Sequence, residues 1–197
     1  MQKFNFTNLI QGSDEWLEYR KGGLGSSDAP IIMGCSPWMT AEELFKEKIG
    51  KKKPKKMTEA MERGHRLEPA ARAYYEFKSE IDFIPITVEH PQYPFLRASL
   101  DGYNEEFKII LEIKAPGRET HLKALRGEVP EHYRIQCLHQ LMVTGANRCD
   151  YFSFDGSRGV VVHVYPNAFD ILTLREQELH FWECVQNKKW APFEVSK

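Results

Sequence analysis

The sequence lacks any long hydrophobic run, which excludes a membrane-spanning helix from the expected fold. No segment approaches the roughly 18 to 20 consecutive apolar residues that such a helix needs. The first residues, Met1 to Phe6, also lack the extended apolar segment of a signal peptide. We therefore expect a soluble intracellular protein with no membrane partner.

Cysteine is scarce, and its spacing is not that of a metal site. The four cysteines are Cys35, Cys137, Cys149 and Cys184. They form no Cys-x-x-Cys pair, and no histidines stand at the spacing that would complete a zinc site. This pattern excludes the usual structural zinc folds and predicts reduced, partly buried thiols.

An excess of charge of one sign is also missing, because the formal net charge of the chain is −1. Proteins that bind DNA usually present clustered Lys and Arg to the phosphates. From Lys46 to Arg66 the chain has nine Lys and Arg against three Glu, a local net charge of +6. The run from Lys51 to Lys56 is compatible both with a solvated loop between helices and with an arm that follows a phosphate backbone.

What is present is a succession of helix and strand patterns over 197 residues, of which 42% are hydrophobic. With no internal repeat or low-complexity tract, residues 1–197 are expected to form one α/β domain. Helices are expected at 14–19, 27–33, 40–49, 58–78, 119–126, 131–144 and 168–187, and strands at 84–89, 96–99, 107–113, 149–154 and 159–165. Thr40 and Glu43 have the spacing of a capping box. Pro69 is expected to interrupt the fourth helix, and Pro85 to place the first strand at an edge or limit its pairing.

Two carboxylates and a lysine fall where two successive strands of this fold would meet. Side chains on a strand alternate between its faces, so Glu112 and Lys114 share one face of the strand that runs from Phe107 to Lys114. Ile109, Leu111 and Ile113 fall on the opposite, core-facing side. A turn around Asn104 to Glu106 would bring Asp101, on the preceding strand, to the same end of a hairpin as Glu112.

Such a group has the chemistry of a metal-dependent nuclease. Mg2+ prefers carboxylate oxygens, a main-chain carbonyl and water in octahedral geometry, which Asp101, Glu112 and the carbonyl of Ile113 could supply. The ammonium of Lys114 could orient a water or offset charge on an attacked phosphate. Glu-x-Lys pairs also occur on many half-exposed strands, so the assignment depends on the flanking residues.

A series of short motifs extends over nearly the whole chain. They are Trp16 to Arg20, Gly25 to Ala29, Arg63 to Ala70, Ser99 to Gly102, Glu112 to Pro116, and Tyr133 to Gln136 followed by Gln140. In this order they resemble the motifs of the phage lambda exonuclease family, also called YqaJ-type viral recombinases, within the PD-(D/E)xK nuclease superfamily. That family often has a proline before the metal-binding aspartate and a cysteine after the lysine, where this chain has Leu100 and Ala115. Neither departure removes a ligand.

The resemblance implies a restriction-endonuclease-like fold, with a central mixed β-sheet flanked by helices, and a catalytic site. It assigns Glu68, Asp101, Glu112, Lys114 and Gln136 to catalysis. Glu68 is implied to bind a second metal or a metal-bound water. Taken alone, Glu68 is compatible with a surface glutamate and Gln136 with an amide on a helix surface.

The resemblance further implies a pocket for the 5′-phosphate of the degraded strand, lined by Arg20, Ser27, Ser99 and Gln136. A guanidinium, hydroxyls and an amide are suitable donors for phosphate oxygens. Gln140 lies one helical turn beyond Gln136, so both side chains can face the site. The sequence alone is equally consistent with Ser27 as a helix N-cap.

The activity implied by the resemblance is a processive, Mg2+-dependent 5′ to 3′ exonuclease acting on double-stranded DNA ends, with Mn2+ as a possible substitute. It would release mononucleotides and leave 3′ overhangs for recombination by strand annealing. A homotrimeric ring, an annealing partner protein, and a phage or prophage origin with the bacterial cytoplasm as location are implied as well. A restriction-like or structure-specific endonuclease and a non-catalytic DNA-end-binding protein are the alternatives.

Overall fold

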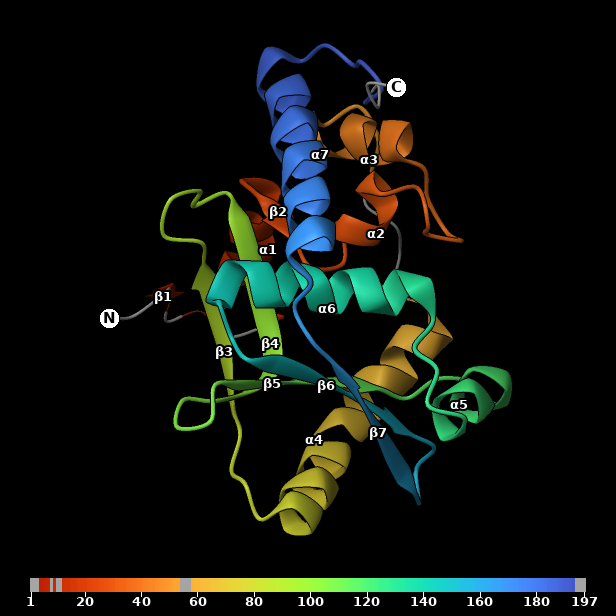
Figure 1. The fold of residues 1–197 in the computed structure, drawn as a ribbon. Coiled ribbons are helices and arrows are strands. Elements are labelled where there is room, and N and C mark those ends of the chain that lie inside the picture. The colour runs from red at the N-terminus through yellow and green to blue at the C-terminus, as the bar shows by residue number, and fades with distance from the viewer. Residues whose placement is uncertain (1–3, 8, 10–11, 54–57, 194–197) are drawn as a thin grey trace.

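The structure is a computed structural model that describes residues 4–7, 9, 12–53 and 58–193. Its centre is a seven-stranded sheet in the order β1-β3-β4-β5-β6-β7, with the short β2 pairing with β4 beside this path (Figure 1). Pairing between neighbours is antiparallel except for β5 with β6 and β2 with β4. The predicted α/β fold with a mixed sheet is confirmed.

The strands and helices follow one another from β1 to α7. The strands are β1 (Asn5–Thr7), β2 (Leu24–Gly25), β3 (Ile84–Glu89), β4 (Leu96–Asn104), β5 (Ile109–Lys114), β6 (Arg148–Phe154) and β7 (Gly159–Val164). The helices are α1 (Asp14–Lys21), α2 (Ala29–Ile32), α3 (Ala41–Lys48), α4 (Glu59–Ser79), α5 (Arg118–Leu125), α6 (Glu131–Thr144) and α7 (Ala168–Asn187). No helix within these described segments is both long and apolar enough to cross a membrane.

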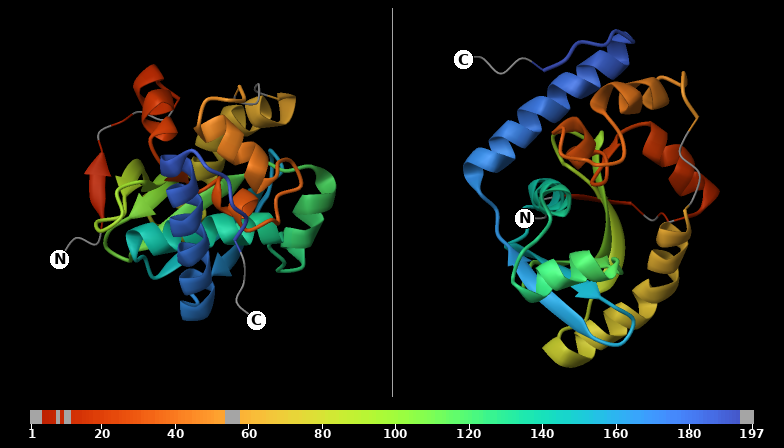
Figure 2. Two further views of the ribbon diagram at one scale, coloured as in Figure 1. Left: turned by 90° about the horizontal axis from the view of Figure 1, so that it is seen from above. Right: turned by 90° about the vertical axis from the view of Figure 1, so that its right-hand side faces the viewer.

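Two hydrophobic cores lie on opposite faces of the sheet. The α6 helix covers one face, where Leu138 and Leu141 join a core that continues to α2, α3 and α7. The long helix α4 covers the other face with Ala71 and Tyr75, against Leu111 and its neighbours on β5. Figure 2 shows α4 and α6 on opposite sides of the central strands in its right-hand view. The strands that carry the predicted site are therefore held from both sides.

The predicted alternation on β5 is confirmed by this arrangement. Ile109, Leu111 and Ile113 pack in the core beneath α4. Glu112 and Lys114 consequently face the α6 side, where both make side-chain contacts described below. The predicted turn is also present, over residues 105–108, between β4 and β5. This hairpin is what brings Asp101 beside Glu112.

Proline has milder effects than the sequence indicated. Pro69 was expected to interrupt the fourth helix, but α4 continues from Glu59 to Ser79 through it, so only the one N–H that proline lacks is missing from the helix. The prediction that the strand containing Pro85 lies at an edge of the sheet is wrong, since β3 pairs with both β1 and β4. Its alternative, limited pairing, is confirmed, because the pairing of β3 with β4 has a register shift between Ile84 and Ile86, at Pro85.

The strand β4 is irregular at the candidate site. Ile84 of β3 pairs with Tyr103 and Ile86 pairs with Leu100, so β4 has one residue more than β3 across the stretch containing Asp101. Such bulges redirect side chains. The next residue, Gly102, has no room for a side chain, because an added Cβ would lie 2.7 Å from the Cβ of Phe83. The backbone of β4 at Gly102 therefore packs closely against Phe83, and the Asp101 side chain lies on the opposite side of the strand.

Candidate active site

The Glu112 carboxylate is the centre of the site and is held by three donors. Its side chain is almost fully buried. The Oε1 atom accepts a hydrogen bond from Nε2 of Gln136 at 2.7 Å and is ion-paired with Nζ of Lys114. The Oε2 atom accepts a hydrogen bond from Nε2 of Gln140. The structure therefore brings together four of the predicted site residues, from β5 and α6.

Asp101 lies against this group from β4. Its Oδ2 atom accepts a hydrogen bond from the main-chain N–H of Ile113 at 2.8 Å. Burial, and next to it the negative charge of Glu112, raise the pKa of the Asp101 carboxyl well above its usual value. Two adjacent buried carboxylates repel each other, so this pair is suited to sharing a cation.

Lys114 supplies the positive charge of the site. Burial by itself lowers the pKa of the Lys114 ammonium, but the carboxylates of Glu112 and Asp101 outweigh burial and raise the pKa above its usual value. The Nζ atom also lies 5.3 Å from the centre of the Tyr133 ring. Lys114 therefore stays protonated at neutral pH, so it can donate hydrogen bonds but cannot act as a general base.

Glu68, on α4, lies at the rim of the carboxylate pair. Its Oε1 atom accepts a hydrogen bond at 2.6 Å from Nη2 of Arg72, four residues later on the helix. Arg72 in turn donates through Nε to the main-chain carbonyl of Asp101 at 2.7 Å. The charge of Glu68 also contributes to the raised pKa of the Asp101 carboxyl. Arg72 thus connects the predicted helical carboxylate to the strand that carries Asp101.

A second group contains three of the residues predicted to bind phosphate, Arg20, Ser27 and Ser99, together with Trp16, and it is here called the Arg20 group. Nη2 of Arg20 donates to Oγ of Ser27 at 3.0 Å, and the guanidinium lies over the Trp16 ring at 4.7 Å. Nε1 of Trp16 donates to Oγ of Ser99 at 2.8 Å. Ser99 is two residues before Asp101 on β4, which separates their Cα atoms by at most about 7 Å. The two groups are therefore neighbours along one strand.

Gln136 and Gln140 face the carboxylate group rather than the Arg20 group. Both amides donate to Glu112. The Oε1 atom of Gln140 accepts from the thiol of Cys149 at 3.5 Å, and the Gln140 side chain is fully buried. In this structure the contacts of the two glutamines are thus with a candidate metal ligand.

The loop that carries Arg20 and Ser27 is fastened from behind by Lys48 of α3. Its Nζ atom donates to the main-chain carbonyls of Gly23 at 2.7 Å and Arg20 at 3.3 Å, and pairs with Asp28 at 2.7 Å. Both charged side chains of this pair are 8% exposed. Burial tends to raise the pKa of the Asp28 carboxyl, but Lys48 and Arg20 outweigh burial and lower it. A buried ion pair therefore sets the course of this loop.

The predicted basic run is only partly described. Residues 54–57 lie outside the described residues, including Lys55 and Lys56. Within the described part, Lys46 pairs with Glu42 and Lys52 with Glu43, both at 2.7 Å. Both lysines pair with carboxylates of α3, and the choice between loop and phosphate-binding arm stays open.

The oxygen atoms at the site fit a hard divalent cation. The described segments contain no group of three His, Cys, Asp or Glu residues placed to hold a metal. Asp101, Glu112 and the Ile113 carbonyl would instead provide two carboxylates and a carbonyl, and Mg2+ commonly takes one or two carboxylates and completes its shell with water and phosphate oxygens. The repulsion between the two carboxylates is the feature that a cation would relieve.

Sequence reasoning did not identify three residues of the site: Trp16, Lys48 and Arg72. Trp16 was expected to pack in the core or at an interface. The pairs Trp16 with Arg20 and Glu68 with Arg72 have helical i,i+4 spacing, which could have indicated the contacts. Nothing local marks Lys48, because its partners lie 20 to 28 residues away along the chain.

Comparison with known proteins places these observations in context. A protein of Bacillus subtilis (strain 168) named YqaJ, itself uncharacterized, is 31% identical over 181 residues, which cover 89% of this chain. The chain spans only 57% of the length of that relative.

Solved structures share the fold. An alkaline exonuclease from Laribacter hongkongensis, LHK-Exo, superposes with a TM-score of 0.78 at 23% identity, covering 89% of this chain and 94% of the other; it has also been solved in complex with dAMP. A phage-related exonuclease from Haemophilus somnus has a TM-score of 0.64 at 13% identity, covering 85% and 96%. The restriction-endonuclease-like fold predicted for the chain is confirmed.

The family is shown by a direct match to a family model. Residues 15–147 match the model described as the YqaJ-like viral recombinase domain. This span begins just before Trp16 and includes Asp101, Glu112 and Gln140, so it contains both groups of site residues. The predicted family resemblance is thereby confirmed, and the chain belongs to the YqaJ-like viral recombinase domain family.

Proposed function

We propose that this chain is a metal-dependent exonuclease that removes nucleotides from the 5′ ends of double-stranded DNA. The observation that carries the proposal is that two groups of side chains meet along β4. Asp101 belongs to a buried carboxylate pair with a lysine, and Ser99, two residues earlier on the strand, belongs to an arginine-hydroxyl group suited to phosphate. One group fits hydrolysis of a phosphodiester, and the other fits recognition of the terminal phosphate. The exonucleases named above share the fold and support this reading.

The Arg20 group is proposed to bind the 5′-phosphate. The guanidinium of Arg20 offers paired N–H donors, and the hydroxyls of Ser27 and Ser99 can complete the coordination of the phosphate oxygens. Arg20 is already positioned by stacking on Trp16 and by its bond to Ser27. A phosphate here would place the first phosphodiester bond of the strand toward Asp101.

The carboxylate group is proposed to perform the hydrolysis. Asp101, Glu112 and the carbonyl of Ile113 would hold Mg2+, or Mn2+ in its place, and the bound ion would polarise the phosphate and lower the pKa of a water. Lys114, kept protonated by its carboxylate neighbours, would donate to that water and offset negative charge on the phosphate. Gln136 would hold Glu112 in position. Glu68 is proposed to bind a second ion or an ion-bound water.

The decisive experiment compares DNA ends. Purified protein is incubated with Mg2+ and linear duplex DNA bearing a 5′-phosphate, the same duplex with a 5′-hydroxyl, or a covalently closed circle. We expect degradation of the linear forms only, fastest with the phosphate, with mononucleotides as product and a 3′ overhang remaining. Chelation with EDTA should stop the reaction.

Variants connect this result to the site. Glu112→Gln keeps the size of the side chain but removes a charge, and should reduce the rate by at least about a thousandfold, because an ion ligand is lost. Glu183→Gln, which removes the same charge from an exposed glutamate of α7, serves as the control. Cutting of the circle would indicate an endonuclease, and metal-free binding of DNA ends without hydrolysis in any divalent ion would indicate a binding protein.

Assembly and partners belong to the same proposal. A homotrimeric ring around DNA would make digestion processive, and a single-strand-annealing protein would use the 3′ overhangs in phage-type recombination. Light scattering tests the ring, which a monomer mass at working concentration would contradict. Co-purification with an annealing protein encoded nearby tests the partner.

A further inference from the structure

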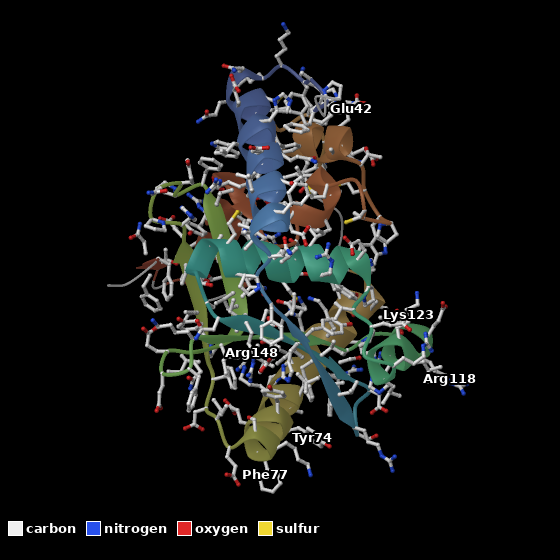
Figure 3. All side chains as sticks on the ribbon, viewed as in Figure 1. Glu42, Tyr74, Phe77, Arg118, Lys123 and Arg148 are labelled. Atoms are coloured by element: carbon white, nitrogen blue, oxygen red, sulfur yellow. The ribbon has the colours of Figure 1, made fainter. Side chains whose placement is uncertain are left out.

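A cavity of about 500 Å3 lies beyond the candidate active site, between α4, α5 and the turn from β6 to β7. Its lining includes Tyr74 of α4, four residues of α5, and Asp155 and Arg158 of the turn. Figure 3 shows Tyr74 on the lower part of α4 and Arg118 on α5. No residue of the two site groups described above lines this cavity.

Arg63 connects the cavity to the end of the catalytic strand. Its Nη1 atom donates to the main-chain carbonyls of Ala115 at 3.1 Å and Pro116 at 3.0 Å, which directly follow Lys114. Its Nη2 atom donates to the carbonyl of Asp155 at 3.2 Å, in the wall of the cavity. One guanidinium thus fastens both segments together, and the cavity adjoins the place where β5 leaves the active site.

The cavity lining carries more positive than negative charge, with two arginines against one carboxylate. Arg118 and Arg158 are exposed, and neither makes an ion pair within the described residues. The acid of the cavity is engaged in its own turn: Oδ1 of Asp155 accepts from the N–H groups of Arg158 and Ser157, both at 2.8 Å. These N–H groups lower the pKa of the Asp155 carboxyl to about 2, so it stays ionised at neutral pH and offsets only one of the two arginine charges. An anionic ligand is the natural complement of the two guanidinium groups.

The rest of the lining is apolar. Leu122 and Leu125 are 42% and 58% exposed, so their side chains are accessible to a ligand. The Tyr74 ring contacts Phe154, with 5.6 Å between ring centres. Apolar and aromatic surface beside arginines is the combination that binds single-stranded nucleic acid, whose bases are free to stack. A duplex keeps its bases inside and presents phosphates.

We infer that this cavity is a binding site for single-stranded DNA, namely the 3′-ended strand left after its complement has been digested. Arg118 and Arg158 contact its phosphates, and its bases lie against Leu122, Leu125 and Tyr74. This inference rests on the proposed nuclease function. It adds a site for the strand that is not cut.

The test is binding of a short fluorescent oligothymidylate to the full chain, measured by anisotropy in EDTA so that no digestion occurs. The Arg118→Gln, Arg158→Gln double variant should raise Kd about tenfold at low salt. The slope of log Kd against log salt should fall by about 1.4, since each phosphate contact on a single strand contributes about 0.7. Leu125→Ser should also raise Kd but leave that slope unchanged.

The matched control is the Lys123→Gln, Arg126→Gln double variant, which removes the same charge from α5 and the residue that follows it, outside the cavity lining. Its Kd should stay within about twofold of the original. Equal weakening in both double variants, or no weakening in either, overturns the inference. Digestion of duplex DNA by the unaltered protein is measured separately and tests the proposed nuclease function. If the unaltered protein digests DNA but the cavity variant binds oligothymidylate as tightly as the unaltered protein, only the inference about the cavity is refuted.

Discussion

At the scale of single residues, the environment of Glu112 explains why the glutamines of α6 belong to the site. Gln140 uses both ends of its amide, donating to Glu112 and accepting from Cys149. A buried amide that is satisfied on both sides has one orientation. We therefore expect Gln140 to act as a positioning residue, which holds Glu112 in one orientation.

Replacing Gln140 tests this role. Gln140→Leu removes one donor to Glu112 while keeping the volume, and should lower kcat by about 10- to 100-fold, as losses around metal ligands do, with little change in KM. Thr144→Val is the control, because Thr144 is a buried polar residue of the same helix. Its hydroxyl donates to the main-chain carbonyl of Gln140 and accepts from the N–H of Ala146. If both variants lose the same activity and the same Tm, the role of Gln140 is structural only.

At the scale of elements, the loop that carries Arg20 and Ser27 depends on a helix that contributes no residue to either site group. Lys48 of α3 holds the carbonyls of Arg20 and Gly23 and pairs with Asp28. Removing one partner of a buried ion pair leaves the other charge unpaired, at a cost of about 3–5 kcal/mol. The geometry between Arg20 and Ser27 should therefore respond to a change at Lys48.

Lys48→Met provides the prediction. The variant should lose most of the preference for 5′-phosphate over 5′-hydroxyl ends and show a raised KM on phosphorylated ends. The rate on 5′-hydroxyl ends should change little, because the carboxylate group is untouched. Lys46→Met on the same helix removes an exposed ion pair with Glu42 and should keep the preference. An unchanged ratio in Lys48→Met would show that the loop holds its shape without the lysine.

A second element contact predicts a pH dependence. Nδ1 of His139 on α6 lies 2.7 Å from Glu178 on α7, and Nε2 lies 2.9 Å from the Arg97 carbonyl. Both partners accept, so the ring donates from both nitrogens when protonated. Burial alone lowers the pKa of the His139 imidazole, but Glu178 outweighs it and raises the pKa above 6.5.

Because the folded pKa is raised, the stabilisation is complete below about pH 6.5 and is lost as pH rises through the folded value. The Tm of the unaltered protein should therefore fall toward alkaline pH by more than that of His139→Gln. Replacement of the exposed His65 by Gln should leave the pH profile unchanged. Parallel profiles for the unaltered protein and His139→Gln would contradict the assignment.

Sequence patterns predicted the elements that have strong local determinants. The capping box at Thr40 is present, and α6 and α7 have the predicted bounds. The strands β1 and β2 were missed because three and two residues are too few to show an alternation. Site residues were predictable where they share a strand or a helix. Contacts such as Lys48 with the loop depend on tertiary packing, which no local spacing records.

At the scale of the whole molecule, the proposed ion site at the carboxylate pair predicts that stability depends on divalent ions. The unliganded fold keeps Asp101 and Glu112 close together with a raised pKa at Asp101, and an ion that binds only the folded state stabilises it.

Mg2+ at about 100 times its Kd should add about 2.7 kcal/mol, equivalent to about 5 to 10 °C in Tm for a chain of this size. Asp101→Asn should abolish most of this rise, and NaCl at equal ionic strength should not reproduce it. The measurement is thermal unfolding with and without the ion. If Mg2+ raised the Tm of Asp101→Asn as much as that of the unaltered protein, the ion would bind at another place.

The candidate site is divided between two parts of the fold that differ in how well they are buried. The carboxylates lie on central strands covered by helices on both faces, whereas Arg20 lies on a short helix with an exposed surface. Segments with fewer buried contacts open first. On warming, the protein should therefore lose its discrimination between kinds of DNA end before it loses the ability to cut, and pass through a less selective nuclease on the way to inactivity.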